Sequence, residues 1–543
     1  MTSIKRNKKM KNQILQITTV GILSSLLAVS SVQAANKKAV AAKAPVKKEA
    51  ASSSAVSAPA KLDRASLEAI SLVKNGDYEQ AIPRLYALVR KASSNAERSQ
   101  LKYSLGISLL ELKLYQVAAF QFVDIIRSND ARFTRLAIEK LMLAADYLGD
   151  DTLLNYAISK IQLQDLPEKN KDIIYYRLGE VKMKNAQFEE AAQSFSRVEA
   201  SSRYYTQAKF NQGRALLEAK RMPEALRIFK SLFDQVANKS VTDINRVAVQ
   251  MAIARTYYQA QQWDDAVEWY RNIPRDTESW HEAMFEQSWA YMRSAKFRSA
   301  LSNFQSLHSS YYDDVYMPEP LLLRSIVYLY ICKYDEMEKV LDLFEKTYSP
   351  VQNSITNLLK SNIDANTLFL DLDKVSVARK SGKTTVAGIK VPYIVAKKIL
   401  DEGDVKRAFG YLRKLVDERK KWNANKNIGK GGLGVYASKI LSNRIKNTRV
   451  AIGEMTRNHM VLVKNELTDL YDQVGFIRYE MTNGKKESLK KKIAGKDISE
   501  QQIDEKVNRE FYIQNGYEYW PFDGEYWLDE IGNYHYLGKQ SCE

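Results

Sequence analysis

The side chains that most often carry catalysis or bind metals are few in this chain of 543 residues. Its four histidines, His281, His308, His459 and His535, lie far apart and show no metal-site spacing. Acidic residues are plentiful, but none forms a distinctive pair, and no set of nucleophile, base and orienting group can be assembled. The sequence therefore predicts a protein that is not an enzyme and that has no cofactor and no metal site.

One glycine-rich string could in principle hold a phosphate. The run Gly429-Lys430-Gly431-Gly432-Leu433-Gly434 fits the G-x-G-x-x-G pattern of dinucleotide-binding folds. That site also needs a strand before the string, within a βαβ unit. The preceding residues 413–426 are charged and typical of a helix instead. We therefore interpret the string as a flexible loop between two helices.

The two cysteines, Cys332 and Cys542, allow two interpretations. In an oxidising compartment they could form a disulfide that holds the C-terminal tail to the preceding helices. The alternative is a buried thiol at Cys332 with a free or intermolecular Cys542. A sequence does not give the distance that a disulfide requires, so both interpretations stay open.

A pattern that recurs from about residue 64 to residue 349 organises the middle of the chain. A small residue such as Gly106, Gly179 or Gly213 is followed nine residues later by a turn position, then by alanine and by an aromatic residue or leucine. A degenerate third copy runs through Ala145 and Leu154. The turn positions are about 34 to 41 residues apart once that copy is allowed for, and they are Tyr78, Tyr115, Phe188, Met222, Trp263, Phe297 and Tyr334.

This period and these residues resemble the tetratricopeptide repeat. The resemblance implies about eight two-helix units over residues 63–349, stacked into an all-α superhelix because no single hairpin could bury its apolar face alone. Scarce glycine (22) and proline (11) also argue against a β-rich fold. Small seam residues would let the two helices of each unit approach closely.

The family's register implies a concave groove lined by the first helix of each unit. Aromatic and arginine side chains on such a wall suit the binding of a partner peptide or helix. The alternative is that several of them pack on a neighbouring repeat or on the C-terminal region. The residues expected to face the groove are Tyr176, Phe210, Arg214, Met251, Arg255, Tyr258, Phe285 and Trp289.

The N-terminus has the features of an export signal. Residues 1–13 carry five basic residues and no acid, and an apolar stretch then leads to Val32-Gln33-Ala34. We interpret residues 1–34 as a cleaved signal peptide, the alternative being an uncleaved anchor. Residues 35–62, rich in Ala, Lys and Pro, are predicted to be a disordered linker. No later apolar run is long enough to span a membrane, which predicts a periplasmic or envelope-associated protein.

The last third of the chain is divided electrically. Residues 374–496 contain 29 Lys and Arg against 11 Asp and Glu. Apolar spacing predicts helices over 393–400 and 405–416, and an extended or coiled-coil-like helix from about Val435 to about Lys492 within a basic helical region, residues 350–500. The export signal argues against nucleic acid as the partner. An anionic cell-wall polymer or membrane surface would suit this charge, and a solvated helical face is the alternative.

The final segment, residues 501–543, is acidic and rich in aromatic rings. So many rings are expected to leave water, either by folding back onto the chain or by docking into another protein. The Pro521-Phe522-Asp523-Gly524 step predicts a turn, which could form a small hairpin. The side chains expected to dock are Trp520, Phe522, Tyr526 and Trp527.

The ending Trp-Pro-Phe-x-Gly-Glu-Tyr-Trp is similar to that of some tetratricopeptide envelope proteins of gliding and predatory Gram-negative bacteria. This resemblance implies an envelope compartment and a motility or envelope-assembly machine. Taken together, the residues predict an exported non-enzymatic scaffold that binds protein partners of a cell-envelope complex. The alternative function is binding of an anionic surface through residues 374–496.

Overall fold

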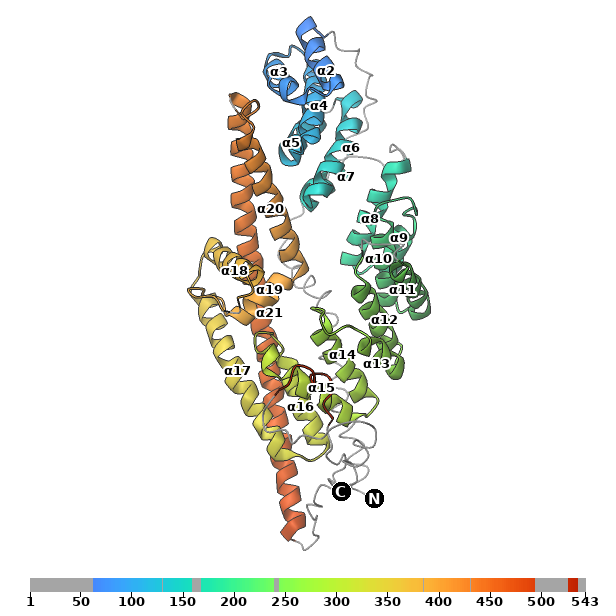
Figure 1. Cartoon of the computed structure of the whole chain (residues 1–543), viewed down its shortest axis with the longest axis vertical. Coiled ribbons are helices and arrows are strands. Elements are labelled where there is room, and N and C mark those ends of the chain that lie inside the picture. Colours follow the sequence, from blue (N-terminus) through green and yellow to red (C-terminus); the bar gives the residue numbers. More distant parts are fainter. Residues whose placement is uncertain are drawn as a thin grey trace, which may run out of the picture. The chain divides into compact units, whose positions relative to one another are not determined.

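The part of the chain that the computed structural model describes is mostly helical (Figure 1). Every regular element there is a helix and none is a strand, so the predicted all-α fold is confirmed. The predicted signal peptide, nearly all of the linker, the predicted hairpin turn, Trp520, Phe522 and Cys542 fall outside the described residues. The described ranges are 62–128, 130–158, 168–238, 244–383, 385–429, 431–493 and 526–535.

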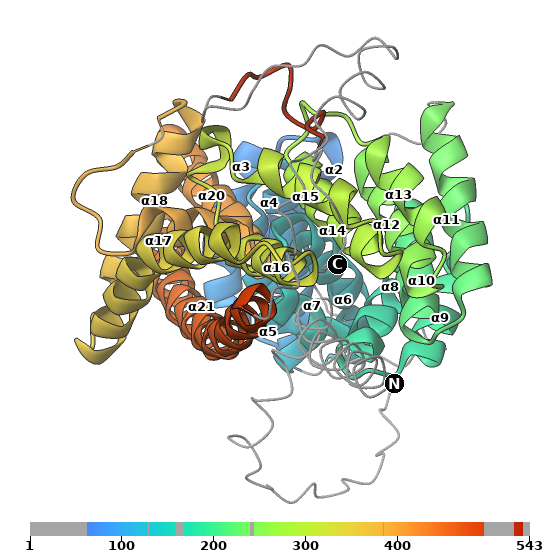
Figure 2. The same ribbon diagram turned by 90° about the horizontal axis from the view of Figure 1, so that it is seen from below.

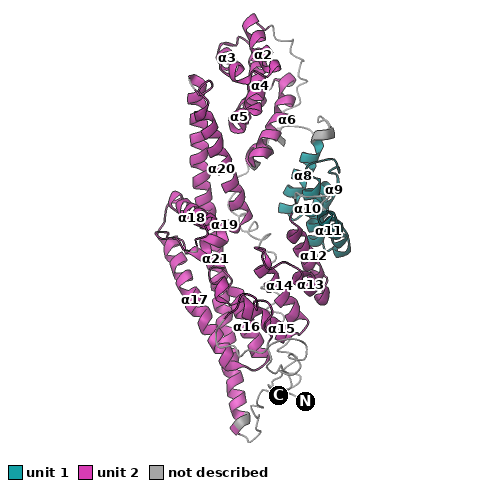
Figure 3. Ribbon diagram, viewed as in Figure 1, with its two compact units in different colours: residues 1–55, 166–244 teal, residues 56–165, 245–543 magenta. Residues whose placement is uncertain are grey.

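The chain divides into two compact units, with residues 166–244 in unit 1 and residues 56–165 and 245–543 in unit 2 (Figure 3). The helices of unit 1 are α8 (Glu168–Lys184), α9 (Phe188–Ser196), α10 (Tyr205–Glu218) and α11 (Met222–Ala237). The first helices of unit 2 are α2 (Arg64–Asn75), α3 (Tyr78–Lys91), α4 (Asn95–Glu111), α5 (Tyr115–Ser128), α6 (Ala131–Leu148) and α7 (Asp151–Ile158). Its later repeat helices are α12 (Arg246–Gln259), α13 (Trp263–Arg271), α14 (Trp280–Arg293), α15 (Phe297–Leu307), α16 (Pro318–Tyr330) and α17 (Tyr334–Lys360).

A left-handed residue makes the turn inside each helical hairpin. Lys113 and Lys220 have φ of 59° and 60°, and Gly76 and Gly149 supply the same conformation. The turn closes by backbone bonds such as Leu114 N to Leu109 O at 2.9 Å, which satisfy carbonyls at the end of the first helix. Every turn position predicted from the sequence is the first residue of a helix. Gly149, just before α7, shows that the degenerate third copy turns in the same way.

The two helices of a hairpin meet at a glycine–phenylalanine seam. A Cβ atom added to Gly179 would lie 2.6 Å from the ring of Phe195, and one added to Gly213 would lie 2.6 Å from the ring of Phe229. Gly106 in unit 2 has the same relation to Phe122, at 2.7 Å. These phenylalanines are fully buried. The missing side chain on one helix therefore makes room for the largest core side chain of the other.

The C-terminal helices of unit 2 pack around one long helix. They are α18 (Ala365–Lys380), α19 (Tyr393–Asp401), α20 (Gly403–Ala424) and α21 (Gly432–Ile493). Thus the predicted extended helix is present, with 62 residues. Instead of forming an isolated coiled coil, α21 packs against α17, α18 and α20 (Figures 1 and 2).

Helices α17 and α21 run antiparallel along their contact. Lys485 Nζ lies 2.7 Å from Glu338 Oε2 near one end, and Gln352 Nε2 donates to Thr468 Oγ1 at 3.2 Å further along. Where α21 then reaches α18, a Cβ atom on Gly453 would overlap the carbonyl group of Ala365. Gly453 is therefore a point of close backbone approach, whereas Gly475 on the same helix has open space around it.

The helices α20 and α21 also reach the first repeats of unit 2. The carboxylate of Glu418 accepts hydrogen bonds from the Gln116 and Val117 amides at 2.8 and 3.0 Å, which caps the N-terminus of α5. Glu418 is only 3% exposed. Burial raises its pKa to about 7, although both amide hydrogen bonds favour the charged form. A helix cap is thus supplied from about three hundred residues away in the sequence.

Candidate protein-interaction site

The predicted groove residues of unit 1 lie on the first helices of its two hairpins. Tyr176 and Phe210 pack edge-on against the seam rings Phe195 and Phe229, with centroid separations of 5.8 and 5.6 Å. Both side chains are half-buried, and burial raises the pKa of Tyr176 to about 12. Arg214, in contrast, is exposed. The first helices of unit 1 therefore carry two partly exposed rings and an exposed cation.

The predicted groove residues of unit 2 are more enclosed. Met251 and Trp289 are only 4% and 7% exposed, so in this arrangement they pack inside the unit rather than line an open wall. Tyr258 and Phe285 are half-buried, and Tyr258 packs edge-on against Trp263 at 5.0 Å between centroids. These four side chains are therefore half-buried or buried within unit 2.

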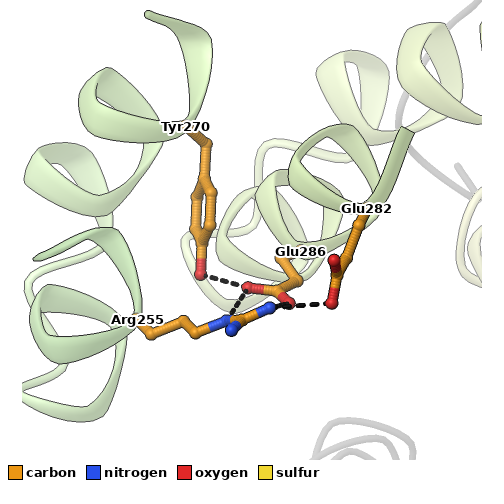
Figure 4. A network of polar contacts seen from close by, with 4 residues as sticks. All are labelled: Arg255, Tyr270, Glu282 and Glu286. Atoms are coloured by element: carbon orange, nitrogen blue, oxygen red, sulfur yellow. Dashed lines mark hydrogen bonds and ion pairs between the residues drawn. The ribbon is translucent and has the colours of Figure 1, made fainter. Parts of the chain in front are cut away.

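Arg255 is held by acidic side chains of the next hairpin (Figure 4). Its guanidinium lies 2.6 Å from Glu286 and 2.8 Å from Glu282, and the Tyr270 hydroxyl donates to Glu286 at 2.8 Å. Burial alone would lower the pKa of Arg255, but the attraction and hydrogen bonding of Glu286, together with the attraction of Glu282, outweigh it and raise that pKa. Burial likewise raises the pKa of Glu282.

Sequence reasoning missed the two glutamates of this network. Both lie on α14 at a spacing of four residues, which places them on one helix face. That spacing is common on solvated helices, so it carried no signal by itself. Only the stacking of α14 beside α12 shows that Arg255 faces them.

A family comparison addresses the repeats themselves. The tetratricopeptide repeat family matches residues 66–131 and 176–237. These two spans contain the three glycine–phenylalanine seams described above. The chain therefore contains tetratricopeptide repeats. The match does not reach the C-terminal tail, so the comparisons give no support to the tail's resemblance to envelope proteins.

Solved structures of similar repeats share little sequence with this chain. One is a crystal structure of Podosopora anserina putative kinesin light chain nearly identical TPR-like repeats, which is 15% identical over 38% of this chain and 90% of that chain, with a TM-score of 0.18. Another is a Rap protein complexed with competence and sporulation factor, 12% identical over 72% of this chain and 98% of that chain, with a TM-score of 0.24. These TM-scores are too low for either structure to support a conclusion about this chain. None of the curated proteins matches the chain.

The described part of the tail, residues 526–535, packs on α14 and α15. Gln305 donates to the Tyr526 hydroxyl at 3.3 Å, and Ile531 is 2% exposed. Trp527, predicted to dock, is instead 59% exposed because Ile531 takes the buried position of this turn. These residues form turns without a strand.

The structure also places the cysteine and the glycine-rich string that the sequence analysis singled out. Cys332 forms a disulfide, but its predicted partner Cys542 lies outside the described residues, so the pairing itself stays a prediction. The glycine-rich string connects α20 to α21 as an interhelical loop, with no strand before it.

The described ranges contain neither a cluster of metal ligands nor a membrane-spanning helix. No three His, Cys, Asp or Glu side chains gather there in a way that could hold a metal ion. His459 instead lies 3.0 Å from Asp404 as an isolated pair. None of the described helices combines the length and apolar character needed to cross a bilayer.

Proposed function

We propose that this protein is an exported, non-enzymatic scaffold that holds a protein partner of a bacterial cell-envelope complex, with motility or envelope assembly as its setting. The observation that carries the proposal is the tetratricopeptide array, whose fold serves protein–protein interaction. Export rests on the basic and apolar leader in residues 1–34, which has the composition of a secretory signal.

The partner surface is assigned to the first helices of unit 1. Arg214 follows the seam residue Gly213, just as Arg255 follows Ala254, so the two arginines hold the same repeat position. Arg255 is partly buried and binds Glu286 and Glu282. Arg214 is exposed. An exposed arginine on a helix that also carries partly exposed rings has the composition of an interaction anchor.

Recovery of partners from envelope extracts tests this assignment. The full chain with Arg214→Glu is expected to lose a partner that the wild-type chain retains. Lys230→Glu is the matched control, because Lys230 is an exposed cation on the second helix of the same hairpin. Equal recovery of every partner by all three proteins would contradict the assignment. Export is tested separately, by cell fractionation and by the N-terminal mass of the mature chain.

Binding of an anionic surface is a second candidate function, favoured by the outer face of α21. Lys439, Lys446 and Lys486 are exposed there, and Phe476 and Tyr479 expose rings on the same helix. This function predicts cosedimentation with anionic vesicles or cell-wall sacculi that weakens steeply as salt rises. Absent or salt-insensitive cosedimentation would reject it.

A further inference from the structure

The segment Tyr526–His535 contacts the repeats of unit 2 chiefly through its backbone. Arg275, in the turn between α13 and α14, donates to the carbonyls of Leu528 and Asp529 at 3.5 and 3.1 Å and also to the carbonyl of Ile531. The amide of Gly532 donates to Ser306 Oγ on α15 at 2.7 Å. One guanidinium thus gathers three carbonyls of a single turn, as a receptor side chain does with a bound peptide.

An apolar contact fixes the same turn. Ile531 is buried, and Gly532 has a φ of 90° and lies against Trp280. A Cβ atom on Gly532 would be 2.9 Å from Trp280 Cζ2, so a larger residue fits neither the space nor the backbone conformation. Trp280 itself is buried, and the Arg275 guanidinium lies 5.7 Å from the centroid of its ring.

A second polar anchor lies at the start of the segment. The Tyr526 hydroxyl accepts from Gln305, whose own Oε1 accepts from Arg324 at 2.8 Å. Tyr526 also packs edge-on against Tyr534 at 6.1 Å between centroids. The acidic residues of the segment, Asp529 and Glu530, complement the charge of Arg275 and Arg324 on the repeats.

We propose that Arg275, Trp280 and Ser306 form a peptide-binding site, and that the chain's own residues 526–535 occupy it as a displaceable ligand. The ligand class is a short acidic peptide that folds as a turn, presents its carbonyls to the guanidinium, buries isoleucine and places glycine against the indole. This site is separate from the wall of unit 1 assigned above. Covalent attachment raises the effective concentration of the tail, so a free peptide competes poorly with it.

A fluorescent peptide of residues 526–535 tests the site in the full-length protein, with a dithiol reductant present so that no disulfide retains the tail. Ile531→Asp in the protein releases the tail, because it places a charge in the buried position. The labelled peptide is expected to bind this variant at least roughly tenfold more tightly than it binds the wild type. Adding Arg275→Ala to the variant is expected to weaken that binding by a similar factor. A peptide carrying Gly532→Ala is the matched control and should not bind.

Three outcomes would overturn the proposal. The first is no binding of the peptide to the Ile531→Asp protein, provided that its thermal unfolding matches the wild type. The second is equal binding with and without Arg275→Ala. The third is a wild-type dimer that forms with concentration and is lost in Ile531→Asp, because the site would then be filled by the tail of a second copy.

Discussion

Arg214 and Arg255 hold the same position in their repeats, yet they have different surroundings. Arg214 follows a glycine that packs on Phe229, and Arg255 follows an alanine in the hairpin that contains the buried Tyr270. The first side chain is exposed, while the second is bound by Glu286 and Glu282. The seam therefore determines the hairpin, and residues outside the seam decide how far the arginine beside it is exposed.

The two units also differ in what packs on their repeats. The helices α16 and α17 of unit 2 support α21, which in turn contacts α18 and α20. The described helices of unit 1 are its two hairpins. Stability in unit 2 is thus expected to depend on the C-terminal helices, and stability in unit 1 on the seams alone.

The largest effect is expected from the seam rings. Phe229→Ala and Phe304→Ala each remove a fully buried ring and should lower the free energy of unfolding by about 3–5 kcal/mol. Hydrogen exchange should locate the loss of protection in α10 and α11 for the first variant, and in α14 and α15 for the second. A loss spread equally over both units in each variant would break the distinction between them.

Gly453→Ala should act on unit 2 alone. The added methyl group would overlap the Ala365 carbonyl, and such overpacking costs about 1–3 kcal/mol. Gly475→Ala is the matched control on the same helix, and we expect it to stabilise α21 by about 0.5–1 kcal/mol because it has open space around it. Equal effects of the two substitutions in chemical denaturation would argue against the close approach of α18 and α21.

The titration of Glu418 tests the cap that links α20 to α5. Its folded pKa of about 7 lies above the ordinary glutamate value of 4.5, so the folded state binds the extra proton between these values. This contribution to stability is fully present below about pH 4.5 and is lost as pH rises through about 7, by roughly 3 kcal/mol in total. Relative to Glu418→Gln, the wild type should lose stability over this range in urea unfolding. A constant difference between the two proteins at all pH values would contradict the assignment.

The next effect on stability is expected from the two arginines that hold the same repeat position. Arg255→Ala leaves Glu286 and Glu282 with fewer partners and should cost about 1–2 kcal/mol. Arg214→Ala, at an exposed site, should change the free energy of unfolding by no more than about 0.5 kcal/mol. If Arg214→Ala proved the more destabilising in thermal unfolding, the expected contrast between the exposed and the partly buried arginine would be reversed.

The smallest effect concerns the left-handed turns. Lys220→Gly removes the cost of a positive φ for a residue with a side chain, roughly 1–2 kcal/mol. Part of this gain is offset because glycine loses more conformational entropy on folding. A net stabilisation of about 0.5–1 kcal/mol is expected for unit 1, and Gln261→Gly should do the same for unit 2. Destabilisation by both substitutions would show that the lysine and glutamine side chains contribute more than the turn geometry suggests.

Local periodicity explains how much of the fold could be predicted. The spacing of Gly179 and Phe195, or of Tyr115 and Ala118, reflects packing within one hairpin. The repeats could therefore be predicted from the sequence. The long helix was also readable, because an apolar stripe such as Ile445, Ile452 and Leu467 extends along it.

Contacts between distant segments could not be predicted in the same way. The cap of Glu418 on Gln116 joins residues about three hundred positions apart, and no local pattern marks it. Likewise, the groove register identified Arg255 but could not show that Glu286 faces it. In the tail, aromatic content drew attention to Trp527, whereas burial selected Ile531.

The most direct test of the proposed scaffold places a photo-crosslinking amino acid at position 214 or at position 255 of the full-length protein in intact cells. Mass spectrometry then identifies what each position contacts. Position 214 is expected to crosslink to another protein, and position 255 is expected to crosslink within the chain, to α14. Crosslinks to a partner from position 255, with none from position 214, would contradict the account.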